Sequence, residues 1–233
     1  MRSDMSPAKS PSTGNRPGRK VLIWDLPTRL FHWLTVALVL AAYLTWRVNW
    51  MDWHAKVGDA VLTLVSFRLL WGFFGSDTTR FADFLARPGV ALRHLTHLFH
   101  REPDRSAGHN AAGGWMVLLL IGLLFGESLS GLHVANDVAD QGPFTELVPA
   151  KVANAITSLH WIFWDALIAA IVLHVAAIAI YAVAKGQNLV VPMVTGRKCL
   201  PADVPQPRMM GVLRAVAFLG GSALAVAVLA NVL

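Results

Sequence analysis

The chain has 233 residues, of which 55% are hydrophobic and 15% are charged, and its mean hydropathy is +0.51. These values exclude an ordinary soluble domain and indicate a membrane protein built from helices. The net charge of +6 does not indicate nucleic acid binding, because the basic residues lie between apolar runs. The single cysteine, Cys199, excludes a disulfide framework, covalent haem attachment and an iron–sulfur cluster, so any redox centre must be non-covalent and held by nitrogen.

The N-terminal segment, residues 1–20, is rich in Ser, Pro, Gly and basic residues, which predicts a disordered tail. No short apolar core with a cleavage site follows it, so we expect no removed signal peptide. The first membrane span is predicted over Leu30–Trp46. Asp25 is expected to cap the helix that leads into it, with Pro27 in the first turn. His32 lies just inside the start of this span.

Four further apolar runs are each long enough to cross a bilayer, which takes about 20 residues in a helix. The first of these is the least apolar, because it contains Lys56, Asp59 and Arg68. Two loops separate the middle spans: a basic loop over 76–112, in which 88–100 is expected to form a short surface helix, and a loop over 133–158. The four predicted spans are His54–Phe74, Gly113–Leu132, Leu159–Ala184 and Val212–Val232.

The distribution of basic residues predicts the orientation of the chain. The N-terminal tail and the second and fourth loops are basic, whereas the first and third loops together offer only Arg47, Lys56 and Lys151. Positively charged residues remain in the cytoplasm. We therefore predict a cytoplasmic N-terminus and a periplasmic C-terminus.

Histidines at matching depths are the main functional signal. His160 and His174 lie fourteen residues apart in one span, which places them within about 40° of the same helix face and about 21 Å apart along the axis. In the predicted topology His32 shares the cytoplasmic level with His174, and His54 shares the outer level with His160. Ligands of one metal must lie at one level. Two bis-histidine sites stacked across the bilayer favour two haems b over zinc, because no Cys, Asp or Glu completes either pair.

Other polar residues in the spans have more than one interpretation. Arg68 either pairs with a haem propionate or extends its charge to the lipid headgroups. Glu127 and Asp165 are expected near the outer histidine level, where they bond a ligand histidine, exchange protons with a quinone, or bond another helix. Gly58, one turn after His54, makes room either for a porphyrin edge or for close helix packing.

Several motifs carry a family resemblance, which covers about Val21–Lys198. The stretches VLIWDLPTRLFHW, FRLLWGFFGS, RFADF, GHNAAGGWM and QNLVVPMVTGRK resemble the bacterial cytochrome b561 / nickel-hydrogenase b-type cytochrome subunit family. The resemblance implies a four-helix transmembrane bundle with two haems b, whose iron ligands fall in the pairing derived above. It also implies a quinone site near the cytoplasmic haem, at Asn110 with His109 and Gly113 as neighbours.

The resemblance implies a function in respiratory electron transport in the bacterial inner membrane. We predict a dihaem cytochrome b domain over 21–198, followed by a linker and an additional transmembrane helix over 199–233. Such a protein passes electrons between the quinone pool and a hydrogenase, a dehydrogenase or a soluble c-type cytochrome. Two alternatives are a self-sufficient superoxide:quinone oxidoreductase and a non-redox subunit whose histidines bind zinc or nickel.

Overall fold

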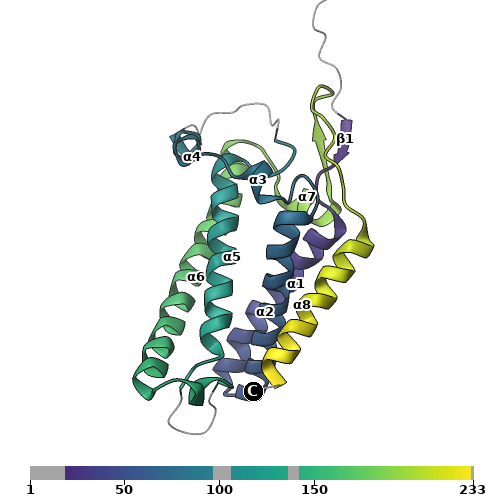
Figure 1. Ribbon diagram of the computed structural model, residues 1–233. Coiled ribbons are helices and arrows are strands. Elements are labelled where there is room, and N and C mark those ends of the chain that lie inside the picture. The colour runs from purple at the N-terminus through teal and green to yellow at the C-terminus, as the bar shows by residue number, and fades with distance from the viewer. Residues whose placement is uncertain (1–18, 97–105, 136–141, 232–233) are drawn as a thin grey trace, which may run out of the picture.

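The computed structural model describes residues 19–96, 106–135 and 142–231. Five of its helices, α1, α2, α5, α6 and α8, are long and apolar enough to cross a membrane, which confirms the prediction of an all-α membrane protein with a fifth span (Figure 1). The elements in chain order are β1 (Arg19–Leu22), α1 (Leu26–Arg47), α2 (Met51–Phe74), α3 (Phe81–Phe84), α4 (Pro88–Thr96), α5 (Ala111–Gly131), η1 (Thr145–Leu147), α6 (Ala150–Ala184), α7 (Val190–Thr195), β2 (Arg197–Leu200) and α8 (Val212–Asn231).

The five long helices lie side by side in the order α6, α5, α2 and α1, with α8 packed mainly on α2. The strands, α3, α4 and α7 all lie at one end of the bundle, at the top of Figure 1. We call this the ribbon end. The turn between α1 and α2 lies at the other end, together with the connection from α5 to α6, and we call it the turn end.

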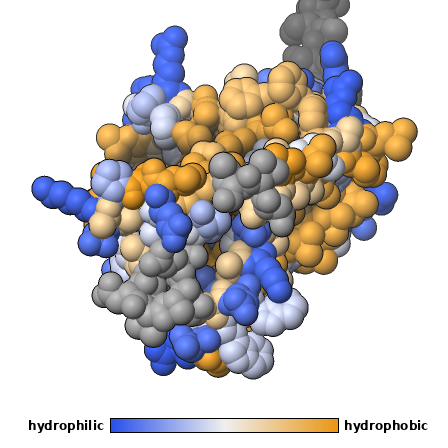
Figure 2. All heavy atoms as spheres, turned by 60° about the horizontal axis from the view of Figure 1, so that its bottom comes forward, coloured by the Kyte–Doolittle hydropathy of each residue, from blue (hydrophilic) through white to orange (hydrophobic). Residues whose placement is uncertain are grey.

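The surface of the bundle suits a lipid environment. Apolar side chains are widely exposed on the helices, including Val183 at 80% and Leu213 at 86%. Figure 2 shows apolar atoms over broad areas of the visible surface, with hydrophilic side chains gathered in other areas. Contiguous exposed apolar surface of this extent is unfavourable in water, so the exposed helix faces contact lipid.

Helix α6 is longer than the sequence predicted. It begins at Ala150 and has 35 residues, so the prediction of a loop as far as residue 158 is wrong. At 1.5 Å per residue the helix is about 52 Å long, whereas the hydrocarbon core of a bilayer measures about 30 Å. The first turns contain Lys151 and Asn154, so a hydropathy pattern detects only the part of the helix that lies in lipid.

A two-stranded ribbon joins the beginning of the described chain to the segment after α6. In this antiparallel pair Arg19 lies opposite Leu200, and Lys20 lies opposite Cys199. The predicted disordered tail is therefore wrong at its last two residues, while residues 1–18 lie outside the described part. Composition could not predict that Arg19 and Lys20 form a strand, because the partner strand β2 is distant in sequence. The short helix predicted over 88–100 is present as α4, and its predicted last residues also lie outside the described part.

Asp25 joins the ribbon ends of α1 and α2. Its Oδ1 accepts a hydrogen bond of 2.8 Å from the backbone N–H of Thr28, which confirms the predicted helix cap. Its Oδ2 accepts a second hydrogen bond, of 3.1 Å, from Trp71 Nε1 and a third from Ser76 Oγ. Asp25 and its partners are buried, so one carboxylate satisfies three donors that water does not reach.

Gly72 permits close packing of α2 against α3. A Cβ atom at this position would overlap the ring of Phe81, which is itself buried. We expect Gly72→Ala to lower the free energy of unfolding by about 1–3 kcal/mol, since overpacking forces a buried ring to move. Thermal unfolding in detergent measures this change. The matched variant Gly122→Ala in α5, where a Cβ meets no atom within 4 Å, should unfold like the wild type. Equal stability of the two variants would contradict the packing role.

Candidate functional site

Two of the predicted histidine ligands meet near the ribbon end. His32 of α1 and His174 of α6 are close enough for their charges to interact, as the depth argument predicted. The Nδ1 atom of His32 is buried and has no hydrogen-bond partner among the described residues. Its ring contacts Trp33 edge-on, with the centroids 4.9 Å apart. We call His32 and His174 the ribbon-end pair.

The other two histidines meet near the turn end. His54 of α2 and His160 of α6 also lie within electrostatic reach of each other, and we call them the turn-end pair. The Nδ1 atom of His54 lies 3.0 Å from the carbonyl oxygen of Ala42, and that of His160 lies 3.1 Å from the carbonyl oxygen of Glu127. Each imidazole is thus bonded to a helix other than its own.

Aromatic rings connect α1 to α6 along the side where these histidines lie. The two helices are not a closely packed pair. Tyr43 stacks on Trp164 with the ring centroids 6.0 Å apart, and Trp46 meets Trp161 at 5.6 Å in an edge-to-face contact. Both contacts lie in the half of the bundle nearer the turn end, so large rings bridge the helices at the level of the turn-end pair.

Arg68 lies inside the protein at the ribbon end. It is only 2% exposed, so the alternative in which its charge reaches the lipid headgroups is wrong. One guanidinium nitrogen donates to the carbonyl oxygen of Thr79 at 3.3 Å, and the group lies 5.3 Å from the ring centroid of Phe81. The other terminal nitrogen, Nη1, is buried and has no hydrogen-bond partner in the part of the chain that the structure describes, which leaves a cationic donor available to an anionic ligand.

The three residues predicted for a quinone site lie together at the start of α5. Asn110 caps the helix by accepting a hydrogen bond of 2.8 Å from the backbone N–H of Gly113. Its side-chain amide donates to the hydroxyl of Tyr181 in α6, also at 2.8 Å. The ring of His109 lies between Trp24 and Phe84, with both centroid distances 4.7 Å. The amide of Asn110 therefore already links α5 to α6.

His109 is held in its neutral form. Burial lowers the pKa of its imidazole to about 3, and the charges of Arg68 and His174 act in the same direction. Its Nδ1 atom has no hydrogen-bond partner within residues 19–96, 106–135 and 142–231. The chain directly before α5 folds inward, so the His109 ring lies between those of Trp24 and Phe84.

This burial predicts a dependence of stability on pH. Because the pKa of His109 is lower in the folded protein than its usual value of 6.5, stability falls as the pH drops below about 6.5. At pH 5 the cost reaches about 2 kcal/mol. We expect His109→Gln to lose less stability than the wild type between pH 7 and pH 5, measured as chemical unfolding in detergent. Parallel pH profiles for the two proteins would contradict the prediction.

The two carboxylates predicted near the outer level differ. Glu127 Oε1 lies 3.4 Å from Nε2 of His160, and Glu127 Oε2 is buried with no hydrogen-bond partner on any described residue. Glu127 thus faces a predicted ligand. Asp165 is exposed on α6, and no hydrogen bond or ion pair joins it to another described residue, so the predicted bond to a ligand histidine is not formed.

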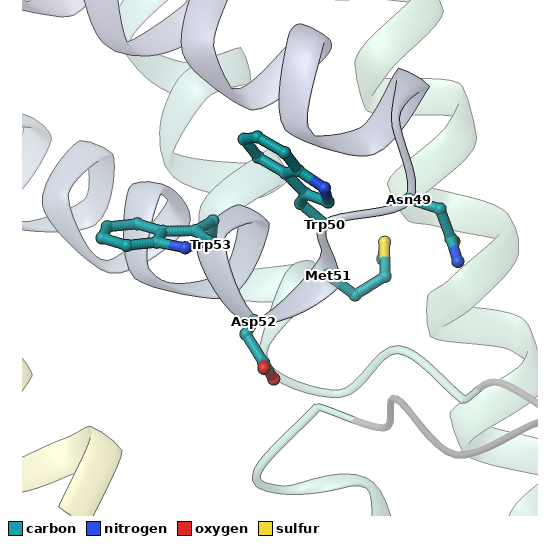
Figure 3. Close-up of a pocket in the computed structure, with 5 residues that line it drawn as sticks. All are labelled: Asn49, Trp50, Met51, Asp52 and Trp53. Atoms are coloured by element: carbon teal, nitrogen blue, oxygen red, sulfur yellow. The ribbon is translucent and has the colours of Figure 1, made fainter.

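Two surface hollows have linings that include none of the four paired histidines. One, with a volume of about 380 Å³, is lined by the residues directly before His54, and Figure 3 shows their side chains around it. A second, of about 240 Å³, lies between α2 and α8 beside Asp59. In the described ranges no group of three or more His, Cys, Asp or Glu side chains forms that could hold a metal ion. Gly58 faces open space, since a Cβ there would meet no atom within 4 Å.

The fold and the paired imidazoles define an integral membrane protein with histidines at two levels of a helical bundle. Residues 23–196 match the family model described as prokaryotic cytochrome b561. The chain therefore belongs to the prokaryotic cytochrome b561 family, as its motifs predicted, and is a membrane b-type cytochrome. Membership implies haem b and electron transfer. No curated protein and no solved structure matches the chain significantly.

Sequence reasoning missed several partners of these residues. Tyr181 follows His174 by seven residues, or two helical turns, so helix periodicity could have placed both on one face. Ser130 Oγ lies 3.0 Å from His160 Nδ1, and Thr45 Oγ1 lies 3.5 Å from His54 Nδ1. No sequence pattern indicates either contact. The carbonyl group of Ala42 carries no signal either, because every residue has one.

Proposed function

We propose that this protein holds two haems b, one at each histidine pair, and passes electrons between a quinone and a redox partner across the membrane. The observation that carries this proposal is the presence of two imidazole pairs at separate levels of one bundle. A pair of imidazoles is a donor set that would hold a haem iron, whereas a structural zinc site takes four ligands.

The surrounding residues fit such a group. His32 and His174 would hold the iron at the ribbon end, and the unpartnered Nη1 of Arg68 would bond a propionate there. His54 and His160 would hold the second iron, and the open space beside Gly58 would admit the porphyrin edge. Ligation by Nε2 of His160 requires the carboxyl of Glu127 to turn aside, which a long side chain allows.

The bound haem supplies reversible one-electron chemistry at iron, and the chain sets the surroundings of that chemistry. Helix α6 fixes the distance between the two levels because it carries one histidine of each pair. The aromatic contacts of Tyr43 and Trp46 with Trp164 and Trp161 link α1 to α6 at the level of the turn-end pair. The neutral imidazole of His109 avoids placing a second cation beside Arg68.

We place the quinone at the start of α5. Asn110, His109 and Gly113 lie there, and Tyr181 adds a hydroxyl bonded to the Asn110 amide. Amide and phenol groups are suitable donors to a quinone carbonyl. In this proposal the ribbon end faces the cytoplasm, and the partner, a hydrogenase, a dehydrogenase or a c-type cytochrome, binds at the periplasmic turn end.

A second candidate function is superoxide:quinone oxidoreduction without a protein partner. The observation that favours it is a group of exposed cations at the turn end: Arg47 beside the ring of Trp46, Lys56 beside that of Trp53, and Lys151. Such cations attract a small anion. Stopped-flow mixing of the purified oxidised protein with superoxide distinguishes the two functions. Only the second function predicts that superoxide reduces the haems directly, without a protein partner.

Haem analysis of the purified full-length protein tests the first proposal. We expect two haems b per chain by pyridine haemochrome assay, and reduction of both by a quinol in the absorption spectrum. A purified, folded protein without reduced b-type bands would overturn the proposal and would favour the non-redox alternative.

A further inference from the structure

A carboxylate lies in the membrane-spanning part of α2, on the side of the helix away from His54. Asp59 is the ninth of the 24 residues of α2. At 1.5 Å per residue the helix is about 36 Å long, so with the helix centred in a hydrocarbon core of about 30 Å, Asp59 lies about 9 Å below its surface. Asp59 follows His54 by five residues, which turns its side chain about 140° around the helix from that imidazole. It therefore belongs to neither histidine pair.

Asp59 lines the hollow of about 240 Å³ between α2 and α8, and Thr63 is the other polar residue of this lining. No hydrogen bond or ion pair joins Asp59 to another described residue. A carboxylate at this depth is costly without a cation, so one copy of the chain leaves the site incomplete. Small side chains on the α8 wall let the backbone of a further helix come close. This wall consists of Ala223, Val226, Ala227 and Ala230.

An exposed cation lies on the same side of α2, one turn nearer the turn end. Lys56 precedes Asp59 by three residues, a spacing that makes two side chains neighbours on a helix surface. The ammonium of Lys56 lies 4.9 Å from the ring centroid of Trp53, and no ion pair joins it to Asp59 in the described part of the chain. The outer side of α2 thus carries a cation and an anion that are about 4.5 Å apart along the helix axis.

We propose that two copies of this chain form a symmetric dimer in the membrane, through the side of α2 and α8 that carries Lys56, Asp59 and the hollow. A twofold axis along the membrane normal places equal residues of the two copies at equal depth. The same surface then serves both copies, so each contact occurs twice. Lys56 of each copy bonds Asp59 of the other, across a difference in depth of about 4.5 Å that a four-carbon side chain spans. The second copy supplies the cation that the hollow lacks.

Charge reversal in the full chain tests this dimer. The purified wild type should sediment as a dimer by analytical ultracentrifugation in mild detergent. Asp59→Lys gives each copy two cations at the interface, and Lys56→Asp gives each copy two anions, so each variant alone should lose the dimer. When the two variants are produced together with different tags, they should co-purify as a mixed dimer, because every cation then meets an anion.

The mixed dimer separates a contact between copies from an ion pair within one copy, since only the former is restored by combining the two variants. A monomeric wild type would overturn the inference, and so would a wild-type degree of dimerisation in either variant alone. Failure of the mixed dimer to form, with the helix content of both variants unchanged by circular dichroism, would overturn it as well. None of these outcomes depends on haem, so the proposed function is tested separately.

A further variant leaves both charges in place. Ala223→Leu fills the hollow and blocks the approach of a second helix, so we expect the dissociation constant of the dimer to rise about tenfold or more. The matched control is Ala225→Leu, because Ala225 is exposed on α8 but two residues further on, about 160° around the helix. An unchanged constant in Ala223→Leu, or an equal rise in Ala225→Leu, would overturn the inference.

Discussion

Replacing His174 by alanine should give a protein that retains one haem b and loses the other. The variant removes one imidazole of the ribbon-end pair. His32 then remains without the second histidine ligand that this pair would supply to an iron. The turn-end pair keeps both of its imidazoles and their backbone carbonyl acceptors. The haem content per chain, measured by pyridine haemochrome assay, should therefore fall to about half of the wild-type value, since histidines would supply the ligands of each iron.

Two further variants complete this test. His54→Ala should also halve the haem content, and the absorption band that remains should differ from the band retained by His174→Ala. His133→Ala is the matched control, because this histidine, at the end of α5, packs on Phe144 and belongs to neither pair. Unchanged haem content in His174→Ala, or a loss in His133→Ala equal to that in the ligand variants, would contradict the pairing.

The largest loss of stability is expected for Asp25→Ala. The variant removes the cap of α1, at a cost of about 1 kcal/mol. It also leaves the buried donors of Trp71 and Ser76 without their acceptor, at about 1–3 kcal/mol each. We expect the free energy of unfolding to fall by about 3–7 kcal/mol, measured by denaturant unfolding in detergent.

A surface carboxylate provides the control for this prediction. Asp83 forms an exposed ion pair with Arg80 at 2.6 Å, and exposed pairs of this kind contribute about 0–1 kcal/mol. Asp83→Ala should therefore unfold almost like the wild type. If Asp25→Ala were as stable as Asp83→Ala, the carboxylate would not be the link between α1 and α2 that its hydrogen bonds indicate.

The membrane spans and the histidine levels could be predicted because both depend on local helix geometry. A fixed rise per residue and an apolar run of known length determine depth without any knowledge of neighbouring helices. The same reasoning placed His32 with His174 and His54 with His160, and in the structure the two members of each pair lie within electrostatic reach of each other. Whether they ligate haem stays a prediction.

Contacts between distant segments could not be predicted in this way. Arg19 pairs with Leu200 through backbone groups that every sequence carries. The inward position of His109 depends on Trp24 and Phe84, which come from two other segments. Burial of Arg68 likewise follows from the fold of the chain beyond α2. In each case the partner is set by tertiary packing, which leaves no periodic pattern in the sequence.

The length of α6 has a consequence for how this chain can change. Because His160 and His174 belong to one uninterrupted helix, their separation obeys the helix repeat alone. Inserting or deleting a single residue between them would rotate one imidazole by about 100° and remove it from its partner. Indels are therefore tolerable in the loops, while the stretch from 160 to 174 must keep its length.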